Sequence, residues 1–172
     1  MATQQCVRLV MALLKTARGL GLPDIQKVIA AMAPLAGARD FLDGLRAECQ
    51  VVILSDTYYQ FAAPLMRALG HPTLFCHELV VDPSGRVRDY RLRMPDQKRE
   101  AVRRLKELNF EVVAAGDSYN DTAMLTEADA GFLFRAPSNV KAEFPQFRAM
   151  DSYDELLREV FDSLEDPVGH SG

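Results

Sequence analysis

The sequence predicts an α/β protein: a Rossmann-like parallel sheet, with a small helical segment before it and a β-hairpin. Three continuous apolar runs have the length of buried strands and lie at residues 51–54, 112–115 and 131–134. Amphipathic helical patterns separate these runs, and the alternation of strands with helices favours parallel neighbours joined by right-handed crossovers. The length of 172 residues, 48% of them apolar, suffices for one core domain with a small appendage.

Helical patterns fill the chain before the first apolar run. Apolar residues recur there at spacings of three and four, which predicts helices over residues 6–18, 23–34 and 38–48. Glycine and proline residues stand between these patterns and end each helix. The first strand of the chain is therefore expected only at about residue 51.

Shorter elements follow that first run. A helix is predicted from Tyr59 to Leu69, and Asp82–Gly85 have the composition of a hairpin turn. Strand candidates flank the turn at residues 73–75, 78–81 and 86–92, and further helices are predicted at residues 97–108, 120–128 and 153–164. The helix at 97–108 is amphipathic, and its basic residues are interpreted as a solvated face: Arg99, Arg103, Arg104 and Lys106.

Charge and cysteine content exclude several classes of protein. The formal net charge is −4, and basic residues alternate with acidic ones instead of gathering in a patch, so nucleic acid is not an expected partner. Cys6, Cys49 and Cys76 are widely spaced, which argues against a disulfide framework or a zinc site and favours free thiols. No apolar run approaches the roughly 20 residues of a membrane span, so we expect a soluble, cytoplasmic protein without a membrane partner.

Polar residues directly follow the apolar run at 51–54. Ser55, Asp56 and Thr57 take this position. In open parallel sheets, ligands bind beyond the carboxyl ends of the strands, where helix N-termini present free N–H groups. All three residue types are also preferred at helix N-termini. The sequence therefore leaves two interpretations open: helix capping, and binding of a phosphate oxygen by a hydroxyl group.

Two carboxylates follow the second buried run, at Asp117 and Asp121, with Gly116 allowing the backbone to turn. Capping of the next helix explains one of these acids but not both. Carboxylate oxygens beside the amide of Asn120 suit Mg²⁺, which binds few carboxylates and completes its octahedron with water and substrate phosphate. Lys98 begins the helix at 97–108 and could neutralise phosphate charge, although lysines usually face solvent.

Together these residues resemble the motifs of a known family. Ser55, Lys98 and the segment GDSYND at 116–121 are similar to the second, third and fourth motifs of haloacid dehalogenase-like phosphatases, and among these to phosphoserine phosphatases. Three stretches resemble the group of bifunctional phosphoserine phosphatases and homoserine phosphotransferases: LSDTYYQFAAPLMRALGHPTLFCHELVVD, AAGDSYNDTAML and FPQF. The resemblance extends from about Gly19 to Leu164.

The resemblance implies a magnesium-dependent phosphomonoesterase of serine biosynthesis. Phosphoserine would be the substrate, with water or homoserine as the acceptor, and the sequence does not choose between them. The resemblance also implies three regions: a helical cap remnant with a linking helix (1–49), a Rossmann-like phosphatase core (50–164) and a flexible tail (165–172). The cap would close over the substrate and exclude water from the site.

The resemblance further implies a role for each motif residue. Ser55 would hydrogen-bond the phosphoryl oxygens, and Lys98 would offset charge on the phospho-aspartate and its nucleophile. Asp117 would bind Mg²⁺ directly, and Asp121 would support the water shell of the metal. The remaining contacts to the phosphorylated substrate would come from Asp56, Thr57 and Asn120.

The nucleophile of this family has no counterpart in the sequence. In the family, an aspartate on a first strand, within a D-x-D-like or D-x-E-like segment, takes up the phosphoryl group. No such segment occurs among the 172 residues. We expect either a chain that begins too late, which we favour, or a relative that has lost the strand, and in both cases little or no activity of this chain alone. A strand missing from the sheet would also leave an open edge and favour a homodimer.

Two other classes of protein stay open. A noncatalytic relative could bind phosphate or phosphoserine around Ser55 and Lys98 without turnover. A signalling receiver domain also combines a parallel sheet, acids and a lysine, but its acidic pair lies near the N-terminus. The histidines have no second histidine or cysteine at metal-ligand spacing and are not expected to bind metal: His71, His77 and His170.

Overall fold

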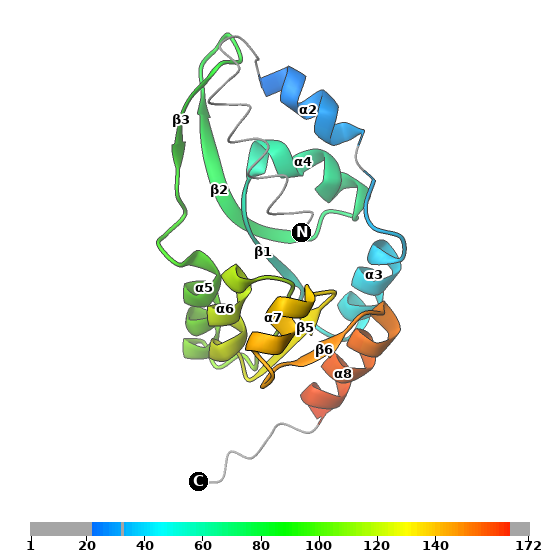
Figure 1. Ribbon diagram of the computed structural model, residues 1–172. Coiled ribbons are helices and arrows are strands. Elements are labelled where there is room, and N and C mark those ends of the chain that lie inside the picture. Colours follow the sequence, from blue (N-terminus) through cyan, green and yellow to red (C-terminus); the bar gives the residue numbers. More distant parts are fainter. Residues whose placement is uncertain (1–21, 32, 166–172) are drawn as a thin grey trace. The chain divides into compact units, whose positions relative to one another are not determined.

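The computed structural model describes residues 22–31 and 33–165, and these fall into two compact units that divide the chain between Pro95 and Asp96 (Figure 1). The predicted helix at 6–18 and the tail after Glu165 lie outside the described residues. Each unit contains a three-stranded sheet with helices, so the predicted α/β class is confirmed. The predicted boundary at residue 50 stays a prediction.

The first unit contains the sheet β1-β2-β3. Strand β1 is parallel to β2, and β2 is antiparallel to β3. Its elements are α2 (Leu22–Ala30), α3 (Ala38–Glu48), β1 (Val52–Tyr58), α4 (Tyr59–Ala68), β2 (Thr73–Val81) and β3 (Val87–Arg91).

Strand β2 is a single long strand where the sequence predicted two. Its first part, Thr73–His77, lies beside β1, and its second part, Glu78–Val81, pairs with β3. The apparent break in the pattern comes from Cys76 and His77, which are both buried. Because the strand exchanges one partner for another at this point, adjacent side chains are covered and the simple alternation is lost.

The predicted hairpin turn is confirmed between β2 and β3. Asp82 organises it: one carboxylate oxygen accepts hydrogen bonds from the N–H groups of Ser84 and Arg86 at 2.9 and 3.0 Å. These bonds, together with those from the Ser84 hydroxyl and Arg88, hold the pKa of Asp82 well below its usual range. Gly85 has a φ of 81°, a conformation that glycine adopts without the steric cost of a side chain.

The first unit has its own apolar core. The buried members come from α2, β1, α4 and β2: Ile29, Tyr58, Phe61 and Leu79. Helix α2 is also fixed by polar contacts, since the Leu22 N–H donates to the Gly85 carbonyl at 2.9 Å and the Gln26 amide donates to the Gln60 carbonyl at 2.9 Å. This helix is therefore integrated into the packing of the first unit.

The second unit contains the all-parallel sheet β4-β5-β6. Two of its elements, α7 and β6, were not predicted, because six- and three-residue segments are too short to show a period. Its elements are α5 (Gln97–Glu107), β4 (Val113–Gly116), the 3₁₀-helix η1 (Tyr119–Asp121), α6 (Thr122–Glu127), β5 (Ala130–Phe134), α7 (Ser138–Glu143), β6 (Arg148–Met150) and α8 (Tyr153–Glu165).

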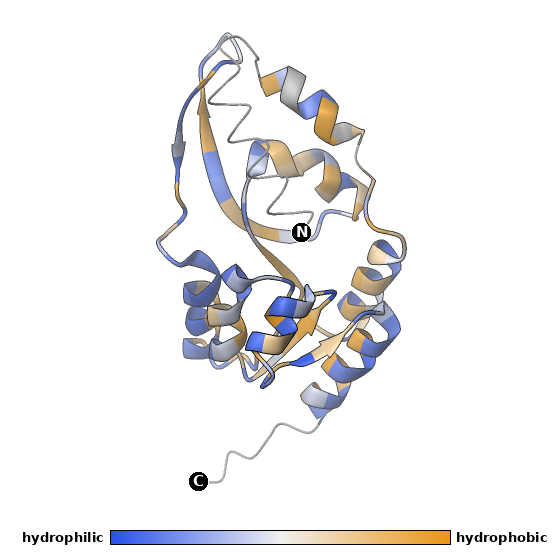
Figure 2. Ribbon diagram, in the orientation of Figure 1, coloured by the Kyte–Doolittle hydropathy of each residue, from blue (hydrophilic) through white to orange (hydrophobic). Residues whose placement is uncertain are grey.

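The core of the second unit surrounds β5, where Leu133 has no exposed surface. Figure 2 shows the contrast between this apolar strand and the mostly hydrophilic α5. The other large and fully buried side chains here come from four helices: Val102, Leu125, Val140 and Leu156. Within residues 22–31 and 33–165, no helix has both the length and the apolar character that crossing a membrane requires.

Truncation of Leu133 tests this core. Leu133→Ala leaves a cavity where the side chain is 0% exposed, and we expect the free energy of unfolding to fall by about 3 kcal/mol. The same truncation at Leu108, which is 68% exposed, should change it by less than about 0.5 kcal/mol. Urea unfolding followed by circular dichroism compares the two variants, and equal losses would contradict the assigned core.

Candidate active site

The polar triplet Ser55, Asp56 and Thr57 lies inside β1 rather than after it. The β1–β2 ladder is regular up to Leu54 opposite Phe75 and resumes only at Tyr58 opposite His77, so β1 carries extra residues across this stretch. Such irregularities redirect side chains and are frequent beside functional sites. Ser55 is buried, and its hydroxyl accepts the Thr57 N–H at 3.4 Å.

The helix-capping interpretation of this triplet is wrong. Helix α4 begins at Tyr59, its N-cap residue is Tyr58, and no side chain caps it. The polar side chains of the triplet are thus not explained by helix formation, because the strand continues past them before the helix starts. Binding of a phosphate oxygen, the other interpretation that the sequence left open, stays a prediction.

His77 lies next to the triplet, a neighbour that the sequence did not reveal. Its Nδ1 accepts the Arg93 N–H at 3.2 Å, so in the neutral ring Nε2 carries the proton, and Nε2 lies 3.9 Å from Asp56 Oδ1. Burial lowers the pKa of His77, and the Asp56 carboxylate offsets only part of that effect. The imidazole is therefore neutral at pH 7 and is positioned against Asp56. Nothing in the sequence indicated this contact, because the strand pattern is interrupted at Cys76 and His77.

In the second unit, Asp121 is the centre of a hydrogen-bond network. Its Oδ1 accepts from Lys98 Nζ at 2.7 Å, and both side chains are largely buried, with 13% of Lys98 and 7% of Asp121 exposed. Its Oδ2 accepts from the N–H groups of Asp117 and Ser118, both at 3.1 Å, and from the Ser118 hydroxyl at 2.9 Å. One carboxylate thus joins the start of α5 to the loop that follows β4.

These contacts decide the charge state of Asp121. Burial by itself would raise the pKa of Asp121, but the charge of Lys98 and the hydrogen bonds from Lys98, Ser118 and Asp117 outweigh it. The pKa consequently lies below its ordinary value, and the side chain is a carboxylate at pH 7. Both carboxylate oxygens of Asp121 accept hydrogen bonds, and those from Asp117 and Ser118 stabilise the conformation of the loop.

Gly116 is required by the close approach of Asp121. A Cβ atom at Gly116 would lie 2.4 Å from Asp121 Cβ and 2.6 Å from its Cγ, distances that no side chain can occupy. The carboxylate can reach Lys98 and the loop N–H groups only because this position has no side chain. The glycine that the sequence identified as a turn residue thus has a packing role.

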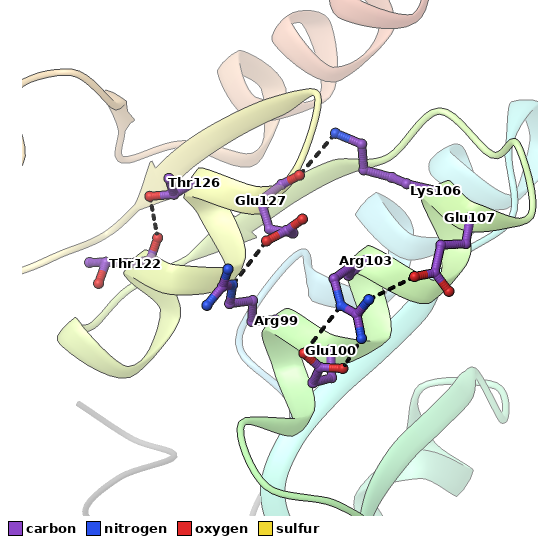
Figure 3. Close-up of polar contacts among 8 residues, drawn as sticks. All are labelled: Arg99, Glu100, Arg103, Lys106, Glu107, Thr122, Thr126 and Glu127. Atoms are coloured by element: carbon purple, nitrogen blue, oxygen red, sulfur yellow. Dashed lines mark hydrogen bonds and ion pairs between the residues drawn. The ribbon is translucent and has the colours of Figure 1, made fainter.

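Helix α5, which carries Lys98, is held against α6 by its basic face (Figure 3). Arg99 Nε lies 2.9 Å from Glu127 Oε2, and Lys106 Nζ donates to the Glu127 carbonyl at 3.0 Å. Arg103 pairs with Glu100 and Glu107 on its own helix. The interpretation of this face as merely solvated is therefore incomplete, because two of its residues contact the end of α6.

The predicted site residues accordingly fall into two groups. Asp121 contacts Lys98 and the backbone of Asp117, and Asn120 is exposed at the same loop. Ser55, Asp56 and Thr57 lie on β1, in the other unit. The prediction that both groups act on one phosphoryl group stays a prediction.

The donor set of the second unit fits a magnesium ion. Asp117 is half-buried at the loop and has a hard carboxylate oxygen, and the amide of Asn120 is exposed at the same loop. Among residues 22–31 and 33–165, no cluster of three or more histidine, cysteine or acidic side chains could enclose a metal ion. The predicted magnesium ion would not require such a cluster, because magnesium keeps several waters and needs only one or two carboxylates.

Comparison with known proteins identifies the class. Residues 12–129 match the family of haloacid dehalogenase-like hydrolases, and the chain belongs to this family. It is 60% identical over 141 residues to the phosphoserine phosphatase ThrH of Pseudomonas aeruginosa and 58% identical over 141 residues to a phosphoserine phosphatase of Pseudomonas syringae pv. tomato. These alignments cover 82% of this chain, 69% of the first relative and 60% of the second.

Solved structures share the fold. A substrate-bound phosphoserine phosphatase complex matches 94% of this chain and 77% of its own with a TM-score of 0.70 and 22% identity. A phosphoserine phosphatase in its apo form matches 94% of this chain and 84% of its own with a TM-score of 0.69 and 21% identity. At this level of identity the likeness establishes the fold alone.

Substitution of Asp121 tests the buried ion pair. Asp121→Asn removes the negative charge that lies 2.7 Å from the largely buried Lys98 ammonium, and we expect a loss of about 3 kcal/mol in the free energy of unfolding at pH 7. Because the pKa of folded Asp121 is lowered, its contribution is complete above the ordinary value of 3.8 and is lost as the pH falls through the folded pKa. The difference between the two proteins should therefore shrink in acid.

Urea unfolding between pH 7 and pH 3 measures this difference. Asp162 is exposed on α8, so Asp162→Asn is the matched control, and it should change stability by less than about 0.5 kcal/mol. A stability loss for Asp121→Asn that stayed the same in acid would show that the ion pair is not its cause.

Proposed function

We propose that this chain belongs to a magnesium-dependent phosphomonoesterase that acts on phosphoserine in the biosynthesis of serine. The relatives named phosphoserine phosphatase, at 60% and 58% identity, support the substrate. The observation that carries the proposal is the contact between Lys98 and Asp121, because it brings a buried cation to a loop of hard oxygen donors. A phosphoryl group needs both kinds of partner.

In the first unit, the proposed role of Ser55 is to donate its hydroxyl proton to a phosphoryl oxygen. The irregular register of β1 supports this role, since the hydroxyl is not used to cap α4. Asp56 and Thr57 would bind the substrate beside it, with neutral His77 fixing the orientation of Asp56. A hydrogen bond to a charged oxygen contributes about 1.5–3 kcal/mol.

In the second unit, Lys98 would offset negative charge on the phosphoryl group. Asp117 would hold Mg²⁺ directly, Asn120 would contact the phosphate, and Asp121 would act indirectly through the loop and the metal's water shell. When bound, Mg²⁺ neutralises charge on the phosphoryl oxygens and orients them. The hydrogen bonds from the loop to Asp121 support this division of roles, because they leave Asp121 little capacity for a metal.

Water and homoserine are the two acceptors that the resemblance implies. Closure of a helical cap formed by residues 1–49 would decide how far water is excluded and hence which acceptor reacts. Comparing phosphate release with formation of phosphohomoserine in the presence of homoserine distinguishes the two.

A noncatalytic relative is the second candidate. It is favoured by one property of the sequence: the 172 residues contain no D-x-D or D-x-E segment. The family's covalent nucleophile lies in such a segment. Under this proposal the chain binds phosphoserine but releases little or no phosphate when tested alone.

Calorimetry combined with a phosphate-release assay separates the two candidates. We expect the 172-residue chain to bind phosphoserine in the presence of Mg²⁺, with Ser55→Ala weakening binding about tenfold through the loss of a hydrogen bond to a charged oxygen. Ser163 donates to the Glu159 carbonyl of its own helix, so Ser163→Ala is the matched control and should bind normally. Binding with steady phosphate release supports the phosphatase and refutes the noncatalytic relative, whereas binding without release is expected both of a noncatalytic relative and of a phosphatase chain that lacks the nucleophile segment. No binding at all would refute both.

Replacement of Asp117 tests the magnesium role. Asp117→Asn removes a carboxylate ligand and should weaken Mg²⁺ binding at least about tenfold, measured by competition with Mn²⁺ in water-proton relaxation. Asp154→Asn, an exposed substitution in the first turn of α8, is the control. Chelation with EDTA should also weaken phosphoserine binding. Equal metal affinities in the two variants would exclude Asp117 as a ligand.

A further inference from the structure

We propose that Tyr119 is a positioning residue that clamps the loop of residues 116–121 to helix α7 and thereby orients Asp117 and Asn120. This inference rests on the proposed magnesium role of that loop and adds a residue that the motif comparison leaves without a function. Its basis is a set of contacts within the second unit. They connect the loop to α7 and to the FPQF segment after it, which lie outside the second, third and fourth motifs.

The Tyr119 hydroxyl group makes two hydrogen bonds to α7. It donates to Glu143 Oε2 at 2.6 Å and accepts from the Asn139 side-chain amide at 3.3 Å. The two partners lie four residues apart, on adjacent turns of the same helix. A hydroxyl held by one acceptor and one donor is fixed in direction as well as in distance.

The Tyr119 ring adds an aromatic contact. It meets Phe144 edge-on, with ring centres 5.8 Å apart and an interplanar angle of 71°. Phe144 in turn stacks on Phe147 at 6.3 Å. These two phenylalanines belong to the FPQF segment at 144–147, so this segment supports the loop from the side of α7.

Simple packing does not account for this arrangement. Tyr119 is 43% exposed, and Asn139 and Glu143 are exposed as well, so the contact buries little apolar surface and adds little to the core. The contact instead fixes the position of Tyr119 relative to α7. The loop is already tied from within by Asp121, which accepts the N–H groups of Asp117 and Ser118.

The loop is thus attached to two different helices, to α5 through Asp121 and to α7 through Tyr119. Asp121 is bonded both to Lys98 and to the backbone N–H groups of Asp117 and Ser118, and the Tyr119 side chain is bonded to α7. Asn120 lies between the residues that make these attachments. With the backbone fixed on both sides, the Asp117 carboxylate and the Asn120 amide have few alternative directions, which lowers the entropic cost of binding a metal ion or phosphate.

Three substitutions isolate the clamp. Tyr119→Phe keeps the ring contact with Phe144 and removes the hydroxyl, and Glu143→Ala removes the acceptor. Glu143→Gln keeps an acceptor oxygen without the charge and should rescue the clamp. Tyr90, which is 48% exposed on β3, provides the matched control Tyr90→Phe.

Two readouts are made on the full 172-residue chain: the Mg²⁺ dissociation constant, and amide hydrogen exchange of residues 117–121. Tyr119→Phe and Glu143→Ala should raise the dissociation constant about tenfold, as is typical for residues that support a metal ligand. They should also speed exchange in the loop, while the unfolding midpoint stays within about 2 °C of the unsubstituted chain. Glu143→Gln and Tyr90→Phe should leave both readouts unchanged.

The outcomes distinguish this inference from the proposed function. Faster loop exchange and weaker Mg²⁺ binding in Tyr119→Phe, with rescue in Glu143→Gln, support the clamp. If the unsubstituted chain binds Mg²⁺ and Tyr119→Phe binds it equally well, the clamp is refuted and the proposed function stands. If the unsubstituted chain does not bind Mg²⁺, the magnesium role itself fails, and the inference fails with it.

Discussion

The arrangement of the second unit depends on the buried contact between Lys98 and Asp121. A lysine ammonium and a carboxylate that are both largely buried must be paired and hydrogen-bonded. An isolated charge in such surroundings would be desolvated at a cost on the order of several kcal/mol. Here the pairing is made by the start of α5 and the end of the loop after β4. Asp121 also accepts two backbone N–H groups, so the same pair determines the path of the loop.

This constraint explains several features that would otherwise be unrelated. Gly116 has no side chain because Asp121 occupies the space. Arg99 and Lys106 contact the end of α6, which keeps α5 in the position from which Lys98 can reach the carboxylate. Gly116 and the contacts of Arg99 and Lys106 thus all help to preserve the geometry of the Lys98–Asp121 pair.

In the first unit, the candidate site residues lie within a strand and not in a loop. Regular pairing would place alternate residues of β1 on opposite faces, and the extra residues opposite β2 break that rule at Ser55–Thr57. The buried, neutral His77 stands beside the break and faces Asp56. An irregular strand end with an adjacent histidine is a local arrangement of polar groups that helix capping does not explain.

The sequence by itself determined the α/β class, the limits of α3 at Ala38 and Glu48 and the hairpin turn at Asp82–Gly85. These follow from side-chain periods and turn residues, which act over a few positions of the chain. Only the tertiary structure decided that β2 is one strand, that α7 and β6 form, that His77 lies beside Asp56, and that Tyr119 is bonded to α7. Such features depend on partners that are far away in sequence. When a distant partner covers a strand or accepts a hydrogen bond, the local sequence carries no periodic pattern that would predict it.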